Sequence, residues 1–192
     1  MDGFDGDWEE KQIGDVLTEE KRFIALEDET EYHLVTVKRR NEGIVSRGFL
    51  FGENILVKNY TRIRSGDYLI SRRQIVHGAN GLVPPTLDNA IVSNEYLVAS
   101  ENDEISTEFL TLLSQTPEMY RKFMLSSYGV DIEKMVFNVE DWKNRNIVIP
   151  RKSEQTAIGH FFRQLDDMLA LQQRQIAALK RIKAALLNKM LI

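Results

Sequence analysis

The stretch that decides the fold is IPRKSEQTAIGHFFRQLD, residues 149–166, which continues as DMLALQQRQIAALKRIKAALLNKMLI, residues 167–192. Pro150 closes a short β-branched run, and after it the chain has no further proline and a single glycine, Gly159. Proline and glycine are the residues that most strongly disfavour a helix interior. The composition therefore predicts one uninterrupted helix, which Ser153 can cap at its start.

Apolar residues recur along this helix at the alternating spacing of four and three that forms a coiled-coil seam. The seam positions, eight of them apolar, are Ile158, Phe162, Leu165, Leu169, Gln172, Ile176, Leu179, Lys183, Leu186 and Met190. A helix of roughly forty residues is about 60 Å long, so we expect much of it to protrude and to require a partner. The alternative is a helical hairpin, although no helix breaker follows Gly159. Gln172 either fixes the register of the seam or lies in a hydrated part of it, and both interpretations stay open.

The chain before Pro150 alternates short strand-like and helical segments, which indicates one mixed α+β domain at residues 1–150, followed by the helix at residues 151–192. The strands predicted from β-branched and aromatic content are Tyr32–Val37, Ile55–Lys58, Tyr68–Ser71, Ala90–Ser93, Tyr96–Ala99 and Ile147–Ile149. Turns are predicted at residues 41–43, 52–54, 65–67 and 78–81, the last followed by Pro84-Pro85. Two short helices are predicted around Phe109 and Phe123, with Thr116 as the N-cap and Pro117 at the first position of the second helix.

The composition excludes several classes of protein. The chain has 192 residues, 43% hydrophobic and 28% charged, which is typical of a folded protein rather than a disordered one. It contains no cysteine, hence no disulfide and no thiol nucleophile. There is no apolar run of about 18 residues and no signal-peptide pattern at the N-terminus, so we expect a cytoplasmic protein without a membrane segment.

The net charge of −4 is unevenly distributed along the chain. Residues 1–31 carry twelve acidic and three basic residues, whereas residues 38–73 carry nine basic and three acidic ones. Residues 151–192 carry eight basic and three acidic residues. Such segregation can place a basic surface on an acidic protein. Alternatively, the segment charges mix in space once the chain folds.

No catalytic constellation is visible in the sequence. The chain lacks glycine-rich nucleotide loops, and His33, His77 and His160 do not have metal-ligand spacing. Val83-Pro84-Pro85 has valine where an amino-methyltransferase motif requires Asn or Asp, and Asp166 and Asp167 point about 100° apart on a helix. We therefore expect no catalytic residue, no metal and no cofactor in this chain.

The stretch 149–166 and the helix after it resemble the junction and conserved helix of specificity subunits of type I restriction-modification systems. That junction has the form I-P-x-x-x-E-Q-x-x-I, which matches Ile149 to Ile158. Trp8 followed by residues 12–16, and residues 64–71 with 91–96, resemble the start and the middle of a target-recognition domain of this family. The resemblance covers essentially the whole chain, and its helical part is the more specific.

The resemblance implies a DNA-recognition subunit in a bacterial or archaeal restriction-modification complex. Family members usually carry two recognition domains and two helices, whereas this chain carries one of each. Two copies could pair their helices antiparallel and read a palindromic bipartite site, or the chain could need a different half as its partner. The implied partners are double-stranded DNA, methyltransferase subunits that use S-adenosylmethionine, and restriction motor subunits that use ATP and Mg²⁺. The resemblance implies that DNA recognition by this subunit directs adenine methylation and restriction, as in phage defence.

If the resemblance holds, the basic segment after Val37 is expected to carry the DNA surface. Arginine and amide side chains can contact guanine and adenine edges, while lysine and further arginine residues contact phosphates. The candidate residues are Lys38, Arg39, Arg40, Arg47, Lys58, Tyr60, Arg62, Arg64, Arg72, Arg73, Gln74, His77 and Asn80. Tyr60 could stack on a distorted base step or serve only in packing. The alternative function is a coiled-coil adaptor whose globular domain binds protein rather than DNA.

Overall fold

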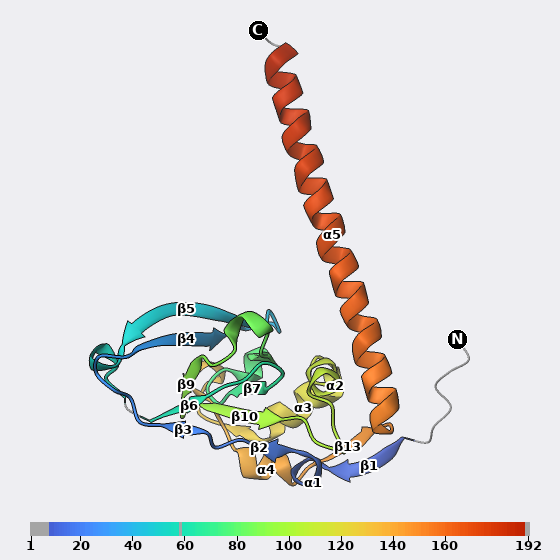
Figure 1. The fold of residues 1–192 in the computed structure, drawn as a ribbon. Helices are drawn as coiled ribbons and strands as arrows, with labels where there is room; N and C mark the ends of the chain where they lie inside the picture. The colour runs from blue at the N-terminus through green and yellow to red at the C-terminus, as the bar shows by residue number, and fades with distance from the viewer. Residues whose placement is uncertain (1–7, 58, 191–192) are drawn as a thin grey trace. The chain divides into compact units, whose positions relative to one another are not determined.

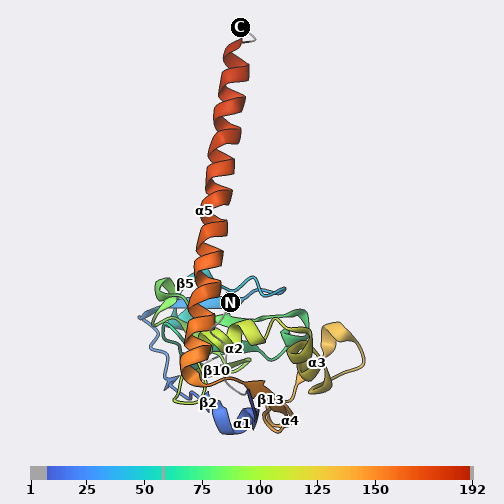
Figure 2. The ribbon, with the colours of Figure 1, turned by 90° about the vertical axis from the view of Figure 1, so that its right-hand side faces the viewer.

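The computed structural model describes residues 8–57 and 59–190. These divide into two compact units, the first ending at Thr156 and the second beginning at Ala157. The first unit is a mixed α+β domain and the second lies within one long helix, α5 (Lys152–Met190), drawn in Figures 1 and 2. The α+β class with a long C-terminal helix is confirmed. The first turn of α5 belongs to the first unit.

Two larger sheets form the centre of the domain. The five-stranded sheet has the order β3 (Phe23–Ile24), β6 (Tyr60–Arg62), β9 (Ile91–Ser93), β4 (Glu31–Val37), β5 (Ile44–Phe51). The four-stranded sheet has the order β2 (Thr18–Glu19), β10 (Tyr96–Ser100), β7 (Tyr68–Ser71), β8 (Asn80–Leu82). The neighbouring strands are antiparallel except for β4 and β9, which are parallel.

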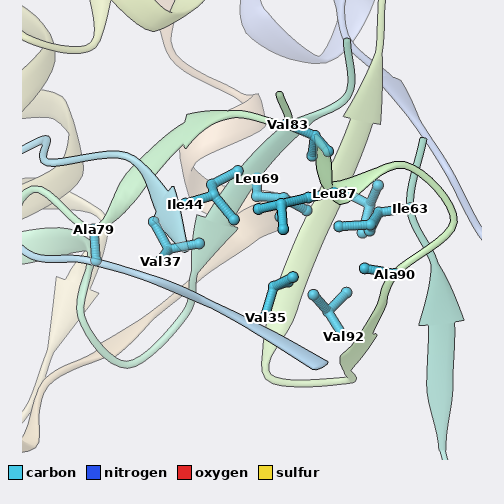
Figure 3. Packing of buried hydrophobic residues seen from close by; sticks show 11 residues of the cluster. Val35, Val37, Ile44, Ile63, Leu69, Ala79, Val83, Leu87, Ala90 and Val92 are labelled. Carbon is cyan, nitrogen blue, oxygen red and sulfur yellow. The ribbon is translucent and has the colours of Figure 1, made fainter. Parts of the chain in front are cut away.

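The main hydrophobic core lies between these two sheets (Figure 3). Val35 and Val37 of β4, with Val92 of β9, pack with Leu69 of β7 and Val98 of β10. Every residue of β7 is buried, because this strand has neighbours on both edges and packed faces on both sides. The core thereby fixes the positions of the turns at the ends of β4 and β7.

Smaller elements complete the domain. They are β1 (Glu9–Gln12), α1 (Ile13–Val16), α2 (Thr107–Leu113), α3 (Pro117–Leu125), β11 (Ser127–Tyr128), β12 (Val136–Phe137), α4 (Val139–Lys143) and β13 (Asn146–Ile149). Short 3₁₀ turns lie at Gly52–Asn54, Ile75–His77, Pro85–Leu87 and Ile132–Lys134. Phe123 of α3, Phe137 of β12 and Trp142 of α4 form an aromatic cluster with ring centroids 5.5–5.8 Å apart. This second cluster packs α3 and α4 together.

Most of the predicted elements are present, with three corrections. Ile55–Lys58 is not a strand: Ile55 ends a 3₁₀ turn with its N–H bonded to the Gly52 carbonyl at 3.2 Å, and Lys58 lies outside the described residues. The second half of the predicted turn at 78–81 belongs to strand β8, which begins at Asn80. Ser153 is not the helix cap, because α5 begins at Lys152 and the N–H groups of Glu154 and Gln155 already donate to the Arg151 carbonyl. Thr116 does cap α3, where its hydroxyl accepts from the Met119 N–H.

Candidate nucleic-acid interface

The basic residues of segment 38–73 divide into those with an acidic partner and those without. Arg39 donates to both carboxylate oxygens of Glu133, at 3.3 and 2.7 Å. Arg73 donates to Glu95 at 2.9 Å, and the contacts of Lys38 with Glu42 (4.0 Å) and of Arg72 with Glu19 (3.9 Å) are longer. These four cations are at least partly neutralised within the domain.

Four arginine residues of the segment have no acidic partner among the described residues. They are Arg40, Arg47, Arg62 and Arg64, and all four are exposed. Lys58, the ninth cation, lies outside the described residues. An exposed guanidinium without an internal partner is available to neutralise a phosphate or to contact a base edge.

Two turns at one end of the sheets are bonded to each other. The β4–β5 turn gives Arg40 and Asn41 successive positive φ angles of 60° and 55°, and the Glu42 N–H donates to the Arg39 carbonyl at 3.3 Å. The Arg40 N–H donates to the His77 carbonyl at 2.7 Å, and the Asn41 N–H donates to that of Gly78 at 2.9 Å. The hairpin turn is therefore anchored on the turn that follows β7.

A concavity of about 460 Å³ lies at this pair of turns. It is lined by Arg39, Arg40, Asn41, Val76, His77, Gly78, Tyr120 and Glu133. The Arg39 guanidinium, hydrogen-bonded to Glu133, lowers the pKa of that carboxyl below its ordinary value of 4.5, and the nearby His77 acts in the same direction. Glu133 therefore stays ionised at neutral pH and holds Arg39 at the wall of the concavity.

Three of the other predicted residues lie at the same turns. Gln74 accepts a hydrogen bond from Arg39 Nε at 2.7 Å. His77 Nε2 is buried 3.4 Å from a Glu133 carboxylate oxygen, without hydrogen-bond geometry. Asn80 is buried in β8 and donates to Asn41 Oδ1 at 3.1 Å, rather than lying in the turn that the sequence predicted.

The remaining predicted residues lie elsewhere on the domain. Arg47 is the extra residue where the β4–β5 register shifts, since Leu34 pairs with Gly48 and Val35 with Ser46. Arg62 pairs with Ile91, which is level with Leu34 of β4, so Arg62 and Arg64 lie away from the turn at residues 38–43. Tyr60 is partly buried and packs against the small core of Tyr32, Leu34, Ile55 and Ile91. Among the described candidates, the structure therefore brings Arg39, Arg40, Gln74, His77 and Asn80 together at the two bonded turns.

Sequence reasoning missed Glu133, Asn41 and Tyr120 at the concavity. Glu133 is 94 residues from Arg39, and an exposed glutamate gives no local sign of such a partner. Asn41 could have been predicted from the sequence as a turn residue, because asparagine tolerates the left-handed conformation and often occupies hairpin turns.

The junction between domain and helix contains a further residue that sequence reasoning assigned only by resemblance. Gln155 is fully buried in the first turn of α5. Its amide oxygen accepts from the Ser106 N–H at 2.9 Å, and its amide nitrogen donates to the carbonyls of Glu104 and Pro150 at 2.9 and 2.8 Å. All three of these hydrogen bonds join the Gln155 side chain to backbone groups, so they fix its position in the domain.

Along α5, every described residue from His160 to Met190 is exposed, including all the predicted seam residues except Ile158, which is partly buried. From Phe161 to Met190, the large apolar side chains of this helix are between 38% and 81% exposed. A helix with such a stripe is expected to associate with another surface. Within residues 8–57 and 59–190, no cluster of three or more His, Asp or Glu side chains could hold a metal ion, and no helix is apolar enough to cross a membrane.

Comparisons with known proteins agree on one family. The family profile described as "Type I restriction modification DNA specificity domain" matches residues 5–181. The Type I restriction enzyme HindI specificity subunit of Haemophilus influenzae is 26% identical over 188 residues, which cover 94% of this chain and 40% of that protein.

Solved structures show the same fold. The HsdS subunit from Thermoanaerobacter tengcongensis has a TM-score of 0.66 at 22% identity, over 88% of this chain and 44% of that one. A chain from a structure of the type I R-M system described for its complex assembly and conformational transition has a TM-score of 0.67 at 19% identity, over 93% and 47%. This chain therefore spans less than half the length of these relatives.

Proposed function

Because this chain belongs to the type I restriction-modification DNA specificity family, we propose that it recognises a DNA sequence for such a complex and performs no chemistry itself. The observation that carries the proposal is the set of four exposed arginine residues without an acidic partner in the described residues of segment 38–73. None of the described acidic residues of segment 1–31 forms an ion pair with them, so their charges are available to phosphates although the whole chain is acidic.

In this proposal residues 1–150 form the target-recognition domain and residues 151–192 form a helix for assembly. Two copies pair through the seam of α5 in antiparallel orientation, so the domains that precede the two helices lie at opposite ends of the pair. Such a dimer reads two identical half-sites around a spacer. The exposed apolar side chains of α5 support this assignment, and a different half-subunit in place of the second copy is the alternative outcome.

Methyltransferase subunits that bind S-adenosylmethionine are the proposed source of adenine methylation, which requires the base to be flipped from the duplex. Restriction motor subunits with ATP and Mg²⁺ are the proposed source of cleavage. The widened apolar stripe of α5 supports a second contact surface: beside the seam residues, Phe161, Met168, Leu171, Ile182 and Leu187 are about half exposed or more.

A protein-binding adaptor is the second candidate function. It is favoured by the edge strand β5, where Phe49, Leu50 and Phe51 are exposed at 57%, 45% and 46%. Exposed apolar residues on an edge strand are typical of a protein-binding surface. The charge distribution favours DNA. Exposed arginine residues without an acidic partner can each neutralise a phosphate and release its counterions, which contributes favourably to binding.

A salt titration of DNA binding separates the two functions. The chain is assembled with the methyltransferase subunits of its own system and titrated onto duplex DNA at about 50 to 200 mM salt. Affinity should fall steeply and linearly on a double logarithmic plot, because each phosphate contact releases counterions. Absent or salt-insensitive binding favours the adaptor. Mapping methylated adenines in cells that carry the same complex then tests the dimer, since identical half-sites require two identical domains.

A further inference from the structure

Arg40 has a backbone conformation that its side chain does not favour. Its φ is 60°, in the left-handed region, where hairpin turns prefer asparagine or glycine because a Cβ crowds the following carbonyl. The next residue, Asn41, is of the favoured kind at φ 55°. An arginine in the first of these two positions is unfavourable for folding. Residues held in such conformations occur mainly at functional sites, which favours a functional role for the Arg40 side chain.

The conformation is fixed by bonds outside the hairpin. The N–H groups of Arg40 and Asn41 donate to the carbonyls of His77 and Gly78 at 2.7 and 2.9 Å. Asn41 also accepts from the buried Asn80, and a Cβ on Gly78 would lie 3.0 Å from Asn41 Oδ1. The turn is therefore held in one position relative to β8, and the base of the Arg40 side chain is held with it.

The charges around the concavity leave Arg40 distinct from its neighbour. The Arg39 guanidinium is occupied by Glu133 and by Gln74. Among the described residues that line the concavity, Arg40 is the one cation without a hydrogen-bond or ion-pair partner for its side chain. A fixed backbone with an unoccupied guanidinium is the arrangement that bidentate recognition requires.

We propose that Arg40 is a specificity-determining residue that donates two hydrogen bonds to O6 and N7 of a guanine in the recognised sequence. This inference rests on the proposed DNA-recognition function and adds the residue and the base. Guanidinium to guanine is the pairing that the planar fork matches in the major groove. Arg39, held by Glu133, instead braces the wall beside it.

The test compares Arg40→Gly with Arg62→Ala in the chain assembled with its methyltransferase subunits. Both variants remove one exposed, unpaired arginine, but Arg62 lies on a regular strand away from the turn. Each complex is titrated onto a duplex with the methylation-mapped sequence and onto an unrelated duplex of equal length. Arg40→Gly should weaken binding to the mapped sequence by roughly 5- to 150-fold. On the unrelated duplex it should lose no more than Arg62→Ala does.

A second arm uses the base itself. Replacing single guanines of the mapped sequence by 7-deazaguanine removes the N7 acceptor. At one position the loss should be present for the unaltered chain and absent for Arg40→Gly, because the contact is already missing. The melting temperature of Arg40→Gly should be unchanged or higher, by up to roughly 4 °C, since glycine adopts the left-handed conformation freely.

Each outcome decides the inference. Equal losses on both duplexes would make Arg40 a phosphate contact and overturn it, as would a melting temperature several degrees lower or a 7-deazaguanine effect that persists in the variant. Unchanged binding of Arg40→Gly would overturn the inference alone, because the unaltered chain in the same titration still prefers the mapped sequence. No preference by the unaltered chain would overturn the proposed function together with the inference.

Discussion

The domain buries its large apolar residues, whereas the helix leaves its own exposed. In the domain, β7 is buried at all four positions and Trp142 is fully buried between Phe123 and Phe137. In α5, residues such as Leu179 and Leu186 are 65% and 56% exposed. Burial of apolar surface is the main favourable contribution to folding. The comparison indicates that the domain is stabilised from within, whereas the apolar stripe of the helix is left uncovered by the described residues, as the proposed assembly role requires.

The largest expected effect is on the helix. Leu179→Asp combined with Leu186→Asp should abolish dimerisation or methyltransferase binding, because burying two carboxylates in an apolar seam is strongly unfavourable. The domain should keep its cooperative melting transition. Size-exclusion chromatography with light scattering measures the association, and circular dichroism measures the melting.

The matched control is Gln173→Asp with Asn188→Asp, which adds the same charge at exposed polar positions outside the seam. The control should associate as the unaltered chain does. Survival of both associations in the leucine double variant would show that the seam is assigned to the wrong face of α5.

The reciprocal experiment perturbs the domain core. Trp142→Ala should lower the domain's free energy of unfolding by about 3–5 kcal/mol, the usual range for removing a large buried aromatic side chain. Trp142→Phe should cost clearly less, because the indole N–H has no hydrogen-bond partner among the described residues and its removal loses none. Denaturant unfolding measures both, and an equal loss in the two variants would contradict this account of the cluster.

The sequence predicts the helix better than it predicts the strands of the domain. The helix follows from local rules, since proline is absent after Pro150 and apolar residues recur at fixed spacing. The longest strand, β5, escapes such rules because Ser46-Arg47-Gly48 interrupts its alternation at a register shift. Ile55 has strand-like neighbours yet ends a turn, because its side chain fills the small core beside Ile91.

Site geometry is less predictable than secondary structure, because it depends on pairs that are distant in sequence. The sequence placed Arg39 and Arg40 in one basic group, and nothing local indicates that Glu133 neutralises one of them and not the other. Gln155 likewise binds backbone groups 49 and 51 residues away. The residue types around the turn were predictable, whereas their division of roles was not.

An intermediate effect is expected where the helix begins. Gln155→Ala leaves the Ser106 N–H and the carbonyls of Glu104 and Pro150 without the amide that they bind. A buried polar group without a partner costs about 1–3 kcal/mol, so the domain should lose stability within or above that range. Gln155→Glu is the sharper companion, because its carboxylate can accept from Ser106 but cannot donate to the carbonyls. A loss in Gln155→Ala below about 0.5 kcal/mol, the low end for a hydrogen bond, would contradict the anchoring role.

The smallest expected effect tests the difference between Arg39 and Arg40. Glu133→Gln removes the charge that neutralises Arg39, so binding to unrelated duplex DNA should strengthen by roughly a few-fold, with a salt slope steeper by about one contact. Glu53→Gln, at an exposed position on another turn, is the control for net charge.

The ion pair between Arg39 and Glu133 should also make the stability of the domain depend on pH. Because Arg39 lowers the Glu133 pKa in the folded state, the pair stabilises the domain above pH 4.5, and this contribution is lost as the pH falls through the folded-state value. Glu133→Gln should lack that acid-side loss of stability. Equal DNA affinity and equal acid melting curves for the variant and the unaltered chain would mean that Arg39 is not restrained by Glu133. The assignment of the guanine contact to Arg40 rather than Arg39 would then lose its electrostatic basis.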